Sequence, residues 1–193
     1  MTVPRVVIFT RFPEPGRAKT RLIPALGPEG AAAMHRLLTE RTLRAVRASG
    51  LPHQLRVTGA PIAAFAEWLG TVEVVDQGEG DLGERLARAG PPYPTLFIGA
   101  DAPDLGPDLL IRAADALATH AAAIGPAEDG GYWLLGLARP IEAVFRSVAW
   151  GTDAVFDQTL ARLAEAGARP MLLPRLADCD RPEDIARWPD LLP

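Results

Sequence analysis

Apolar residues in this chain form short β-branched runs that alternate with longer segments of helical periodicity. Short apolar runs predict strands, and apolar residues three or four positions apart predict helices. We expect strands at Val3–Phe9, Gln54–Thr58, Val72–Val75, Thr95–Ile98, Ala121–Ile124, Tyr132–Leu137 and Pro170–Leu173. We expect helices at Pro28–Ser49, Pro61–Leu69, Asp81–Ala89, Asp108–Thr119, Thr152–Ala166 and Pro182–Trp188. The segment Arg11–Leu26 is rich in proline, glycine and charge, which predicts a loop.

This alternation of strands and helices predicts an α/β protein with a mostly parallel mixed sheet and helices on both faces. The 193 residues contain no internal repeat, low-complexity tract or linker, so we expect one domain over residues 1–193. Ligands bind such sheets beyond the carboxyl ends of the strands. Residues that directly follow strands are therefore the first candidates for chemistry.

Composition and charge exclude several classes of site. A net charge of −4 argues against nucleic acid as a partner. The single cysteine excludes an internal disulfide, and the three histidines lack the spacing of a catalytic zinc site. Of the 20 lysine and arginine residues, only Lys19 is a lysine. A lysine retained in a chain that otherwise uses arginine is of functional interest.

No segment approaches the roughly 20 apolar residues that a membrane helix needs. Met1–Thr10 contains no signal-peptide apolar region or cleavage site. We therefore expect no membrane span and a cytoplasmic location.

The loop after the first predicted strand carries four cations and a glycine. Backbone N–H groups and cations on such a loop can bind phosphates, with arginine giving bidentate contacts and lysine a compact point charge. The alternative is a mobile, solvated basic loop. The residues concerned are Arg11, Gly16, Arg17, Lys19 and Arg21.

A carboxylate follows the predicted strand Thr95–Ile98. Asp101 lies at the end of this strand, where it could hold a hard cation such as Mg²⁺ together with substrate phosphates. The alternative is a turn in which Asp104 or Asp108 caps the next helix. Asp101 lies too early in the sequence for that role.

The segment Gly125–Trp133 contains Asp-Gly-Gly between two predicted strands. One interpretation is a hairpin turn. The other is that the glycines let backbone approach a ligand while Asp129 faces the site. Tyr132 and Trp133 point to opposite faces of a strand, so only one of them can face the cleft.

Asp178 and Asp180 lie two residues apart and share one face of an extended segment. Two carboxylates on one face repel each other unless a cation bridges them. Alternatively, Asp180 begins the last helix as a cap ahead of Pro182. In either case Cys179 points away as a structural thiol.

The segment Gly78–Gly83 matches the GxGxxG pattern of dinucleotide-binding folds. Its acidic residues would place negative charge near a pyrophosphate. Asp81 and Glu84 instead match the spacing of a capping box, so we expect a helix start at this position.

Taken together, six motifs in order along the chain resemble the DUF2064 family, whose members are described as GT-A-fold glycosyltransferases and include a branch linked to arsenosugar biosynthesis. The motif Lys-Thr-Arg-Leu, the Asp-x-Pro turn and the last acidic motif are also similar to those of the 2-phospho-L-lactate guanylyltransferases. The matching segments are Phe12–Leu22, Gly80–Arg85, Gly99–Leu105, Gly125–Tyr132, Trp150–Thr152 and Asp178–Asp184.

The resemblance implies a GT-A (nucleotide-diphospho-sugar transferase) type of fold and assigns roles to the motif residues. It implies nucleotide binding by Arg11, Gly16, Arg17, Lys19, Arg21, Gly80 and Asp81. It implies substrate binding by Gly130, Gly131 and Tyr132, and a Mg²⁺ or Mn²⁺ ion on Asp101, Asp178 and Asp180. The catalytic residues would be Lys19, Asp101 and Asp129. The chain has alanine at 100 and 102, where relatives often carry small polar residues.

The expected activity is that of a metal-dependent transferase with a nucleotide-activated donor, and a nucleotide-sugar-dependent glycosyltransferase fits best. Its partners would be a small-molecule nucleotide donor and an acceptor. The same residues also suit a guanylyltransferase-like nucleotidyltransferase acting on a small phosphorylated acceptor. A third hypothesis is a non-catalytic nucleotide-binding protein on this fold.

Overall fold

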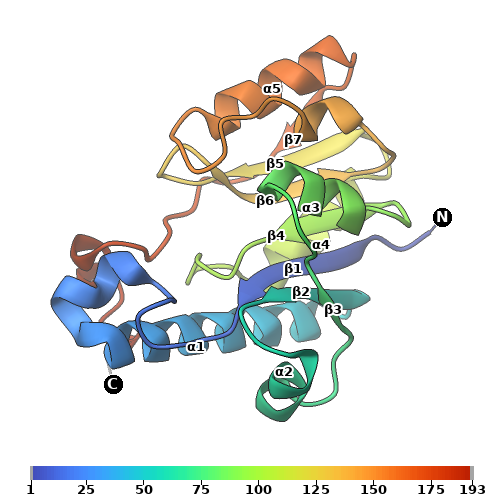
Figure 1. Cartoon of the computed structure of the whole chain (residues 1–193). Coiled ribbons are helices and arrows are strands. Elements are labelled where there is room, and N and C mark those ends of the chain that lie inside the picture. The colour runs from blue at the N-terminus through green and yellow to red at the C-terminus, as the bar shows by residue number, and fades with distance from the viewer. Residues whose placement is uncertain (1, 192–193) are drawn as a thin grey trace.

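The computed structural model describes residues 2–191, which form one seven-stranded sheet in the order β3-β2-β1-β4-β6-β5-β7 (Figure 1). β6 runs antiparallel to β4 and β5, and the other neighbouring strands pair in parallel. The predicted mostly parallel mixed sheet is therefore confirmed. The strands are β1 (Arg5–Arg11), β2 (His53–Thr58), β3 (Val74–Asp76), β4 (Thr95–Ile98), β5 (Ala122–Pro126), β6 (Tyr132–Leu137) and β7 (Pro170–Leu172).

Helices cover both faces of this sheet, as predicted. Val6 and Ile8 of β1 pack against one layer, while Val7 between them packs against the other, because successive strand residues point to opposite faces. The first layer contains α1 (Ile23–Ser49), α2 (Ile62–Leu69) and α4 (Pro107–Ala116). The second contains α3 (Leu82–Ala89), α5 (Val155–Glu165) and the 3-10 helix Glu142–Phe145.

The predicted boundaries differ from the observed ones mainly around the first loop. α1 begins at Ile23 and is interrupted at Gly27, which has φ 70°, before it continues from Pro28. The prediction of loop as far as Leu26 is therefore wrong for its last residues, because Leu22 and Leu26 pack into a small core of their own. The last predicted helix is a 3-10 helix, Pro182–Arg187, followed by a second at Pro189–Leu191.

This small core ties the end of the chain to the loop after β1. Leu22 and Leu38 pack with Cys179 and Trp188, although these pairs are far apart in sequence. Cys179 is fully buried, which confirms the structural role expected for this thiol. The packing places the last acidic motif beside the basic loop (Figure 1).

The connection between β5 and β6 is a tight turn, so the hairpin interpretation of Asp-Gly-Gly is confirmed. The Ala127 N–H donates to the Gly131 carbonyl over 3.0 Å, and the Gly131 N–H donates to Asp129 Oδ1 over 2.8 Å. Gly130 has φ 88° and lies against the backbone of Asp153, where a Cβ atom would be 2.3 Å from a carbonyl oxygen.

We expect Gly130→Ala to lower the free energy of unfolding far more than Gly151→Ala. Both glycines have positive φ, at 88° and 81°, so both variants carry a backbone cost of about 1 kcal/mol. A Cβ at Gly151 meets no atom within 4 Å, whereas one at Gly130 collides with backbone and adds about 2 kcal/mol. Urea denaturation of the two variants measures the difference. Equal losses would contradict this packing of the turn.

No helix within residues 2–191 is both long and apolar enough to cross a membrane.

Candidate functional site

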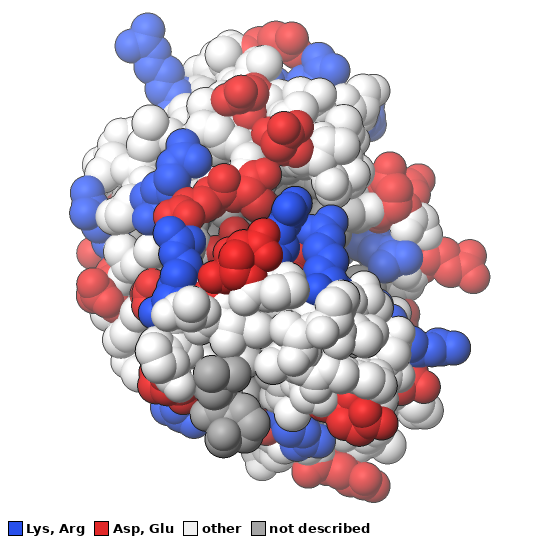
Figure 2. Space-filling view, turned by 90° about the vertical axis from the view of Figure 1, so that its left-hand side faces the viewer, with Lys and Arg blue, Asp and Glu red and all other residues white. Residues whose placement is uncertain are grey.

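Two adjoining cavities open at the carboxyl ends of β1 and β4, each with a volume of about 470 Å³. The basic pocket is lined by Phe9, Thr10, Arg11, Arg17, Lys19, Thr20, Arg21, His35, Thr58, Gln77, Leu82, Ala100, Asp101 and Asp180. Acidic and basic side chains gather across the middle of one face of the molecule, turned toward the viewer in Figure 2. Phe9, Arg21 and Leu82 line both cavities, so the two form one continuous cleft.

The second cavity, here named the apolar pocket, lies between the sheet and α3. Its apolar walls come from Leu82, Leu86, Phe97, Trp150 and Val155. Its remaining lining residues are Phe9, Arg21, Ile98, Gly99, Asp129, Gly131, Tyr132, Trp133, Gly151, Thr152, Asp153, Asp178 and Arg181.

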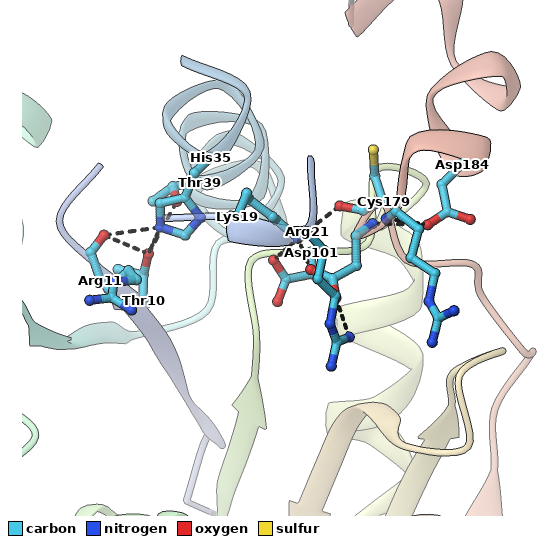
Figure 3. Close-up of polar contacts among 11 residues, drawn as sticks. Thr10, Arg11, Lys19, Arg21, His35, Thr39, Asp101, Cys179 and Asp184 are labelled. Carbon is cyan, nitrogen blue, oxygen red and sulfur yellow. Dashed lines mark hydrogen bonds and ion pairs between the residues drawn. The ribbon is translucent and has the colours of Figure 1, made fainter. Parts of the chain in front are cut away.

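Lys19 lies at the centre of the polar network shown in Figure 3. Its side chain is only 4% exposed, and its backbone adopts the left-handed conformation with φ 47°. The ammonium donates to the Cys179 carbonyl over 2.8 Å and to Asp180 Oδ1 over 3.3 Å, and it also contacts Asp101. The lone lysine therefore joins the loop after β1, the end of β4 and the C-terminal segment.

Opposite charge outweighs burial in setting the ionisation of this cluster. Burial by itself lowers the pKa of Lys19, but the charges of Asp101 and Asp180 raise it above its ordinary value. Desolvation would raise the pKa of Asp101, yet the charge and hydrogen bond of Lys19 lower it below its ordinary value. Both groups are therefore ionised at neutral pH.

Cations engage both oxygens of the Asp180 carboxylate. Arg21 Nη1 donates to Asp180 Oδ2 over 2.6 Å, and Lys19 binds the other oxygen. The carboxylate of Asp184, instead, accepts the backbone N–H groups of Asp180 and Arg181 at the start of the 3-10 helix Pro182–Arg187. The alternative role of Asp180 as a helix cap is therefore wrong, because Arg181 occupies the N-cap position and both oxygens of the Asp180 carboxylate bind cations.

His35 is a member of the site that the sequence interpretation missed. It projects from α1 beneath the basic pocket, where its Nε2 lies 3.0 Å from the Arg11 carbonyl and 3.3 Å from Thr10 Oγ1. Burial lowers the pKa of this imidazole, so it is neutral at pH 7. Its place on the apolar face of α1 with Leu38 made it resemble a core residue. It fixes the end of β1 from which Arg11 extends.

Three acidic residues line the apolar pocket, Asp129, Asp153 and Asp178. Asp129 comes from the β5–β6 turn and Asp178 from the C-terminal segment. Burial, followed by the charge of Asp129, raises the pKa of Asp178 to about 6. Tyr132 and Trp133 pack on opposite sides of the sheet, as strand alternation predicts. Both nevertheless line the pocket, so the expectation that only one of them faces the cleft is wrong.

We expect Asp178→Asn to stabilise the protein at about pH 8 but not at about pH 4. A folded-state pKa near 6, above the ordinary 3.8, makes the wild-type unfolding free energy fall as pH rises between these values. Asp178→Asn has no carboxyl group to ionise, so it does not lose this stability. At about pH 8 its unfolding free energy is expected to exceed that of the wild type by about 1–2 kcal/mol, a value reduced for solvent screening. Urea denaturation of both proteins across this pH range, in EDTA, measures it. A gain that does not change with pH would contradict the assignment, and Asp153→Asn is the control.

Some predicted ligand-binding residues lie outside both pockets. Asp81 and Glu84 form the expected capping box at the start of α3, each carboxylate accepting the other residue's N–H over 2.8 Å. Gly80 precedes this cap, and Gly16 is exposed on the basic loop. From the same region Gln77, which was not predicted, does line the basic pocket.

The three predicted metal ligands all border the cleft, and their carboxylate oxygens suit Mg²⁺ or Mn²⁺. Asp101, whose side chain is 51% exposed, lines the basic pocket, and Asp178 lines the apolar pocket. All three also line a third, smaller cavity of about 180 Å³, together with Asp129. Lys19 lies between Asp101 and Asp180. Among residues 2–191, no three acidic, histidine or cysteine side chains are grouped closely enough to form a metal site.

Comparison with known sequences supplies a family match. Residues 42–152 match the family described as "Uncharacterized protein conserved in bacteria (DUF2064)". The match includes β4 with Asp101 and the turn with Asp129, while the basic loop and the last acidic motif lie outside it. No curated protein matches the sequence.

Solved structures share the fold over nearly the whole chain. A proposed nucleotide-diphospho-sugar transferase of Desulfovibrio desulfuricans G20 is 30% identical, with a TM-score of 0.88, over 94% of this chain and 84% of that one. Rv0371c of Mycobacterium tuberculosis H37Rv, in complex with manganese, is 20% identical with a TM-score of 0.59 over 99% and 98%. The 4-diphosphocytidyl-2C-methyl-D-erythritol synthase of Anaerococcus prevotii DSM 20548 is 11% identical with a TM-score of 0.63 over 96% and 94%. The last two share the fold alone.

Proposed function

The chain belongs to the DUF2064 family, and from this premise we propose that it is a metal-dependent transferase that uses a nucleotide sugar as its donor. The observation that carries the proposal is the pairing of the two pockets. The basic pocket combines Arg11, Arg17, Lys19 and Arg21 with Asp101, which suits a diphosphate and its metal ion. The adjoining apolar pocket offers a separate place for an acceptor, with Asp129 on its wall.

The cations of the basic pocket would act on the leaving group. When the bond between the sugar and the diphosphate breaks, negative charge grows on the departing nucleoside diphosphate. Lys19 is fixed by its three oxygen partners, so its charge needs no reorganisation as the reaction proceeds. Arg17 is exposed on the loop, where it pairs with Glu14 across 3.5 Å, and it would exchange this partner for a bound diphosphate.

A divalent cation held by Asp101, together with Asp178 or Asp180, would supply further positive charge to the diphosphate. Asp101, Asp178 and Asp180 line one small cavity of about 180 Å³, and such an ion would lie there. The carboxylates are hard oxygen ligands, which suits Mg²⁺ or Mn²⁺.

Asp129 is the candidate general base for the acceptor. In glycosyl transfer the acceptor oxygen bonds to the anomeric carbon as the bond to the diphosphate breaks, and the acceptor proton passes to a base. Asp129 lines the apolar pocket, and the Gly131 N–H that binds its Oδ1 holds the carboxylate in place.

Nucleotidyl transfer is the second candidate, because the same cations and carboxylates can act on the α-phosphate of a nucleoside triphosphate. It is favoured by the fold shared with the 4-diphosphocytidyl-2C-methyl-D-erythritol synthase of Anaerococcus prevotii. The released product separates the two: nucleoside diphosphate indicates glycosyl transfer, and pyrophosphate indicates nucleotidyl transfer.

Thermal-shift titration with nucleotide sugars and nucleoside triphosphates, each with and without Mn²⁺, tests the proposal. We expect a nucleotide sugar to raise the melting temperature more when Mn²⁺ is present, since ligand binding to the folded state stabilises it. Absence of a metal-dependent shift with any nucleotide would contradict it. Nucleotide binding without turnover, in the wild type as in Asp101→Ala, would favour a non-catalytic nucleotide-binding role.

A further inference from the structure

The apolar pocket has the size and walls of a small-molecule site. Its volume of about 470 Å³ lies within the range of roughly 300–1,000 Å³ that is usual for ligand pockets. Leu82 and Leu86 of α3, Phe97 of the sheet, Trp150 and Val155 are among the apolar residues that line it. A ligand with an aromatic or aliphatic body would bury apolar surface against all of these side chains.

The polar groups of this pocket are mainly negative. Three carboxylates line it, from Asp129, Asp153 and Asp178, against two cations. One of the cations, Arg21, is already bound to Asp180 over 2.6 Å. Asp129 and Asp178 line this pocket and also line the smaller cavity beside it.

The basic pocket has the opposite balance, with four cations against the two carboxylates of Asp101 and Asp180. The cleft is therefore divided into a side that attracts phosphate and a side that repels it. Like charges in a partly desolvated cavity raise the free energy of a bound anion, so a phosphate group would favour the basic side.

We infer that the acceptor bound in the apolar pocket has an apolar, ring-sized body without a phosphate group, and that it presents a hydroxyl or amino group to Asp129 and Asp178. This inference rests on the proposed function, because it assigns the acceptor to the pocket beside the donor. It also separates this chain from transferases whose acceptors are small phosphorylated molecules.

Three probes that share a benzyl body and differ in their polar group test the inference: neutral benzyl alcohol, cationic benzylamine and anionic benzyl phosphate. Each is titrated into the full-length protein at neutral pH, and binding is followed by the NMR signal of the Trp150 indole N–H, assigned with Trp150→Phe. We expect benzyl alcohol and benzylamine to shift this signal, and benzyl phosphate to bind at least about tenfold more weakly at this site. Equal or tighter binding of benzyl phosphate at Trp150, or no shift with any probe, would overturn the inference.

Two variants with matched exposure locate the binding. Leu82 and Ile111 both lie on helices and are 41% and 43% exposed, but only Leu82 lines the apolar pocket. We expect Leu82→Ser to weaken benzyl alcohol binding at least about fivefold and Ile111→Ser to leave it unchanged. Equal effects of the two variants on benzyl alcohol binding would show that the ligand does not bind in the apolar pocket.

A third variant tests the charge. Asp178→Asn removes one carboxylate while keeping its shape, so we expect benzylamine to bind several-fold more weakly and benzyl phosphate more tightly, with benzyl alcohol little changed. Weakening of all three probes to the same extent would overturn the electrostatic part of the inference.

Nucleotide binding is measured on the same samples by titration with a nucleoside diphosphate and Mn²⁺, with Arg17→Ala as the basic-pocket variant. A protein that binds the nucleotide but prefers benzyl phosphate at Trp150 contradicts the acceptor class and leaves the proposed function intact. A protein that binds benzyl alcohol at Trp150 but no nucleotide contradicts the proposed function, and with it the assignment of the pocket to an acceptor.

Discussion

Lys19→Arg is expected to reduce turnover by about 100-fold while the protein still folds. The Lys19 side chain is 4% exposed, and three oxygen atoms surround its ammonium group. A guanidinium carries the same charge, but it is planar and larger, so it cannot occupy this position without displacing Asp101 or Asp180. Lys19→Arg therefore keeps the positive charge but moves it away from the position between Asp101 and Asp180.

Two measurements test Lys19→Arg: its turnover number and its melting temperature. The turnover number is measured with the donor that the thermal-shift titration identifies. Arg44→Lys, an exchange at an exposed position of α1, is the matched control and is expected to leave both unchanged. Lys19→Met removes the charge itself, leaves two carboxylates facing each other, and is expected to lower the free energy of unfolding by about 1–3 kcal/mol. Wild-type kinetics in Lys19→Arg would show that the single lysine has no special role.

Asp101→Asn is expected to reduce turnover by about 10²- to 10³-fold and to weaken Mn²⁺ binding at least about tenfold. The amide keeps the size of the carboxylate and can still accept from Lys19, so the fold persists. It lacks the negative charge that a hard cation requires. Asp101 is the predicted metal ligand that follows directly from β4, and the sheet fixes its position.

Asp104→Asn is the matched control for Asp101→Asn, because both lie in the turn after β4. Asp104 accepts the Trp188 indole N–H over 3.0 Å, and an asparagine oxygen can do the same. We expect this control to retain turnover and Mn²⁺ affinity. Calorimetric titration with Mn²⁺ and steady-state kinetics compare the two variants. Equal losses in both would assign the effect to the shape of the turn and contradict metal binding by Asp101.

The sequence predicts the fold well because its elements carry strong local signals. β4 and β6 have the predicted bounds, and the capping box of Asp81 and Glu84 begins α3 as expected. The helical start at Ile23 was not predicted. Leu22, which precedes this start, and Leu26 pack against a C-terminal segment distant in sequence. Tertiary contacts of this kind leave no local pattern.

The site was predictable in its residue types but not in its pairings. Residues after strands were the right place to search, and Lys19, Asp101 and Asp180 lie within contact of one another. A lysine, and not a cation from solution, lies between the carboxylates of Asp101 and Asp180. This arrangement follows only from the packing of the C-terminal segment. His35 was missed because a buried histidine on an apolar helix face has the sequence pattern of a core residue.

The most direct test of the central claim is a crystal structure of the protein with Mn²⁺ and a nucleoside diphosphate, with the metal located by its anomalous scattering. The account predicts a manganese peak at Asp101, a diphosphate beside it in contact with Lys19 and Arg17, and an apolar pocket still open next to the diphosphate. A diphosphate bound in the apolar pocket, or a manganese ion away from Asp101, would contradict it.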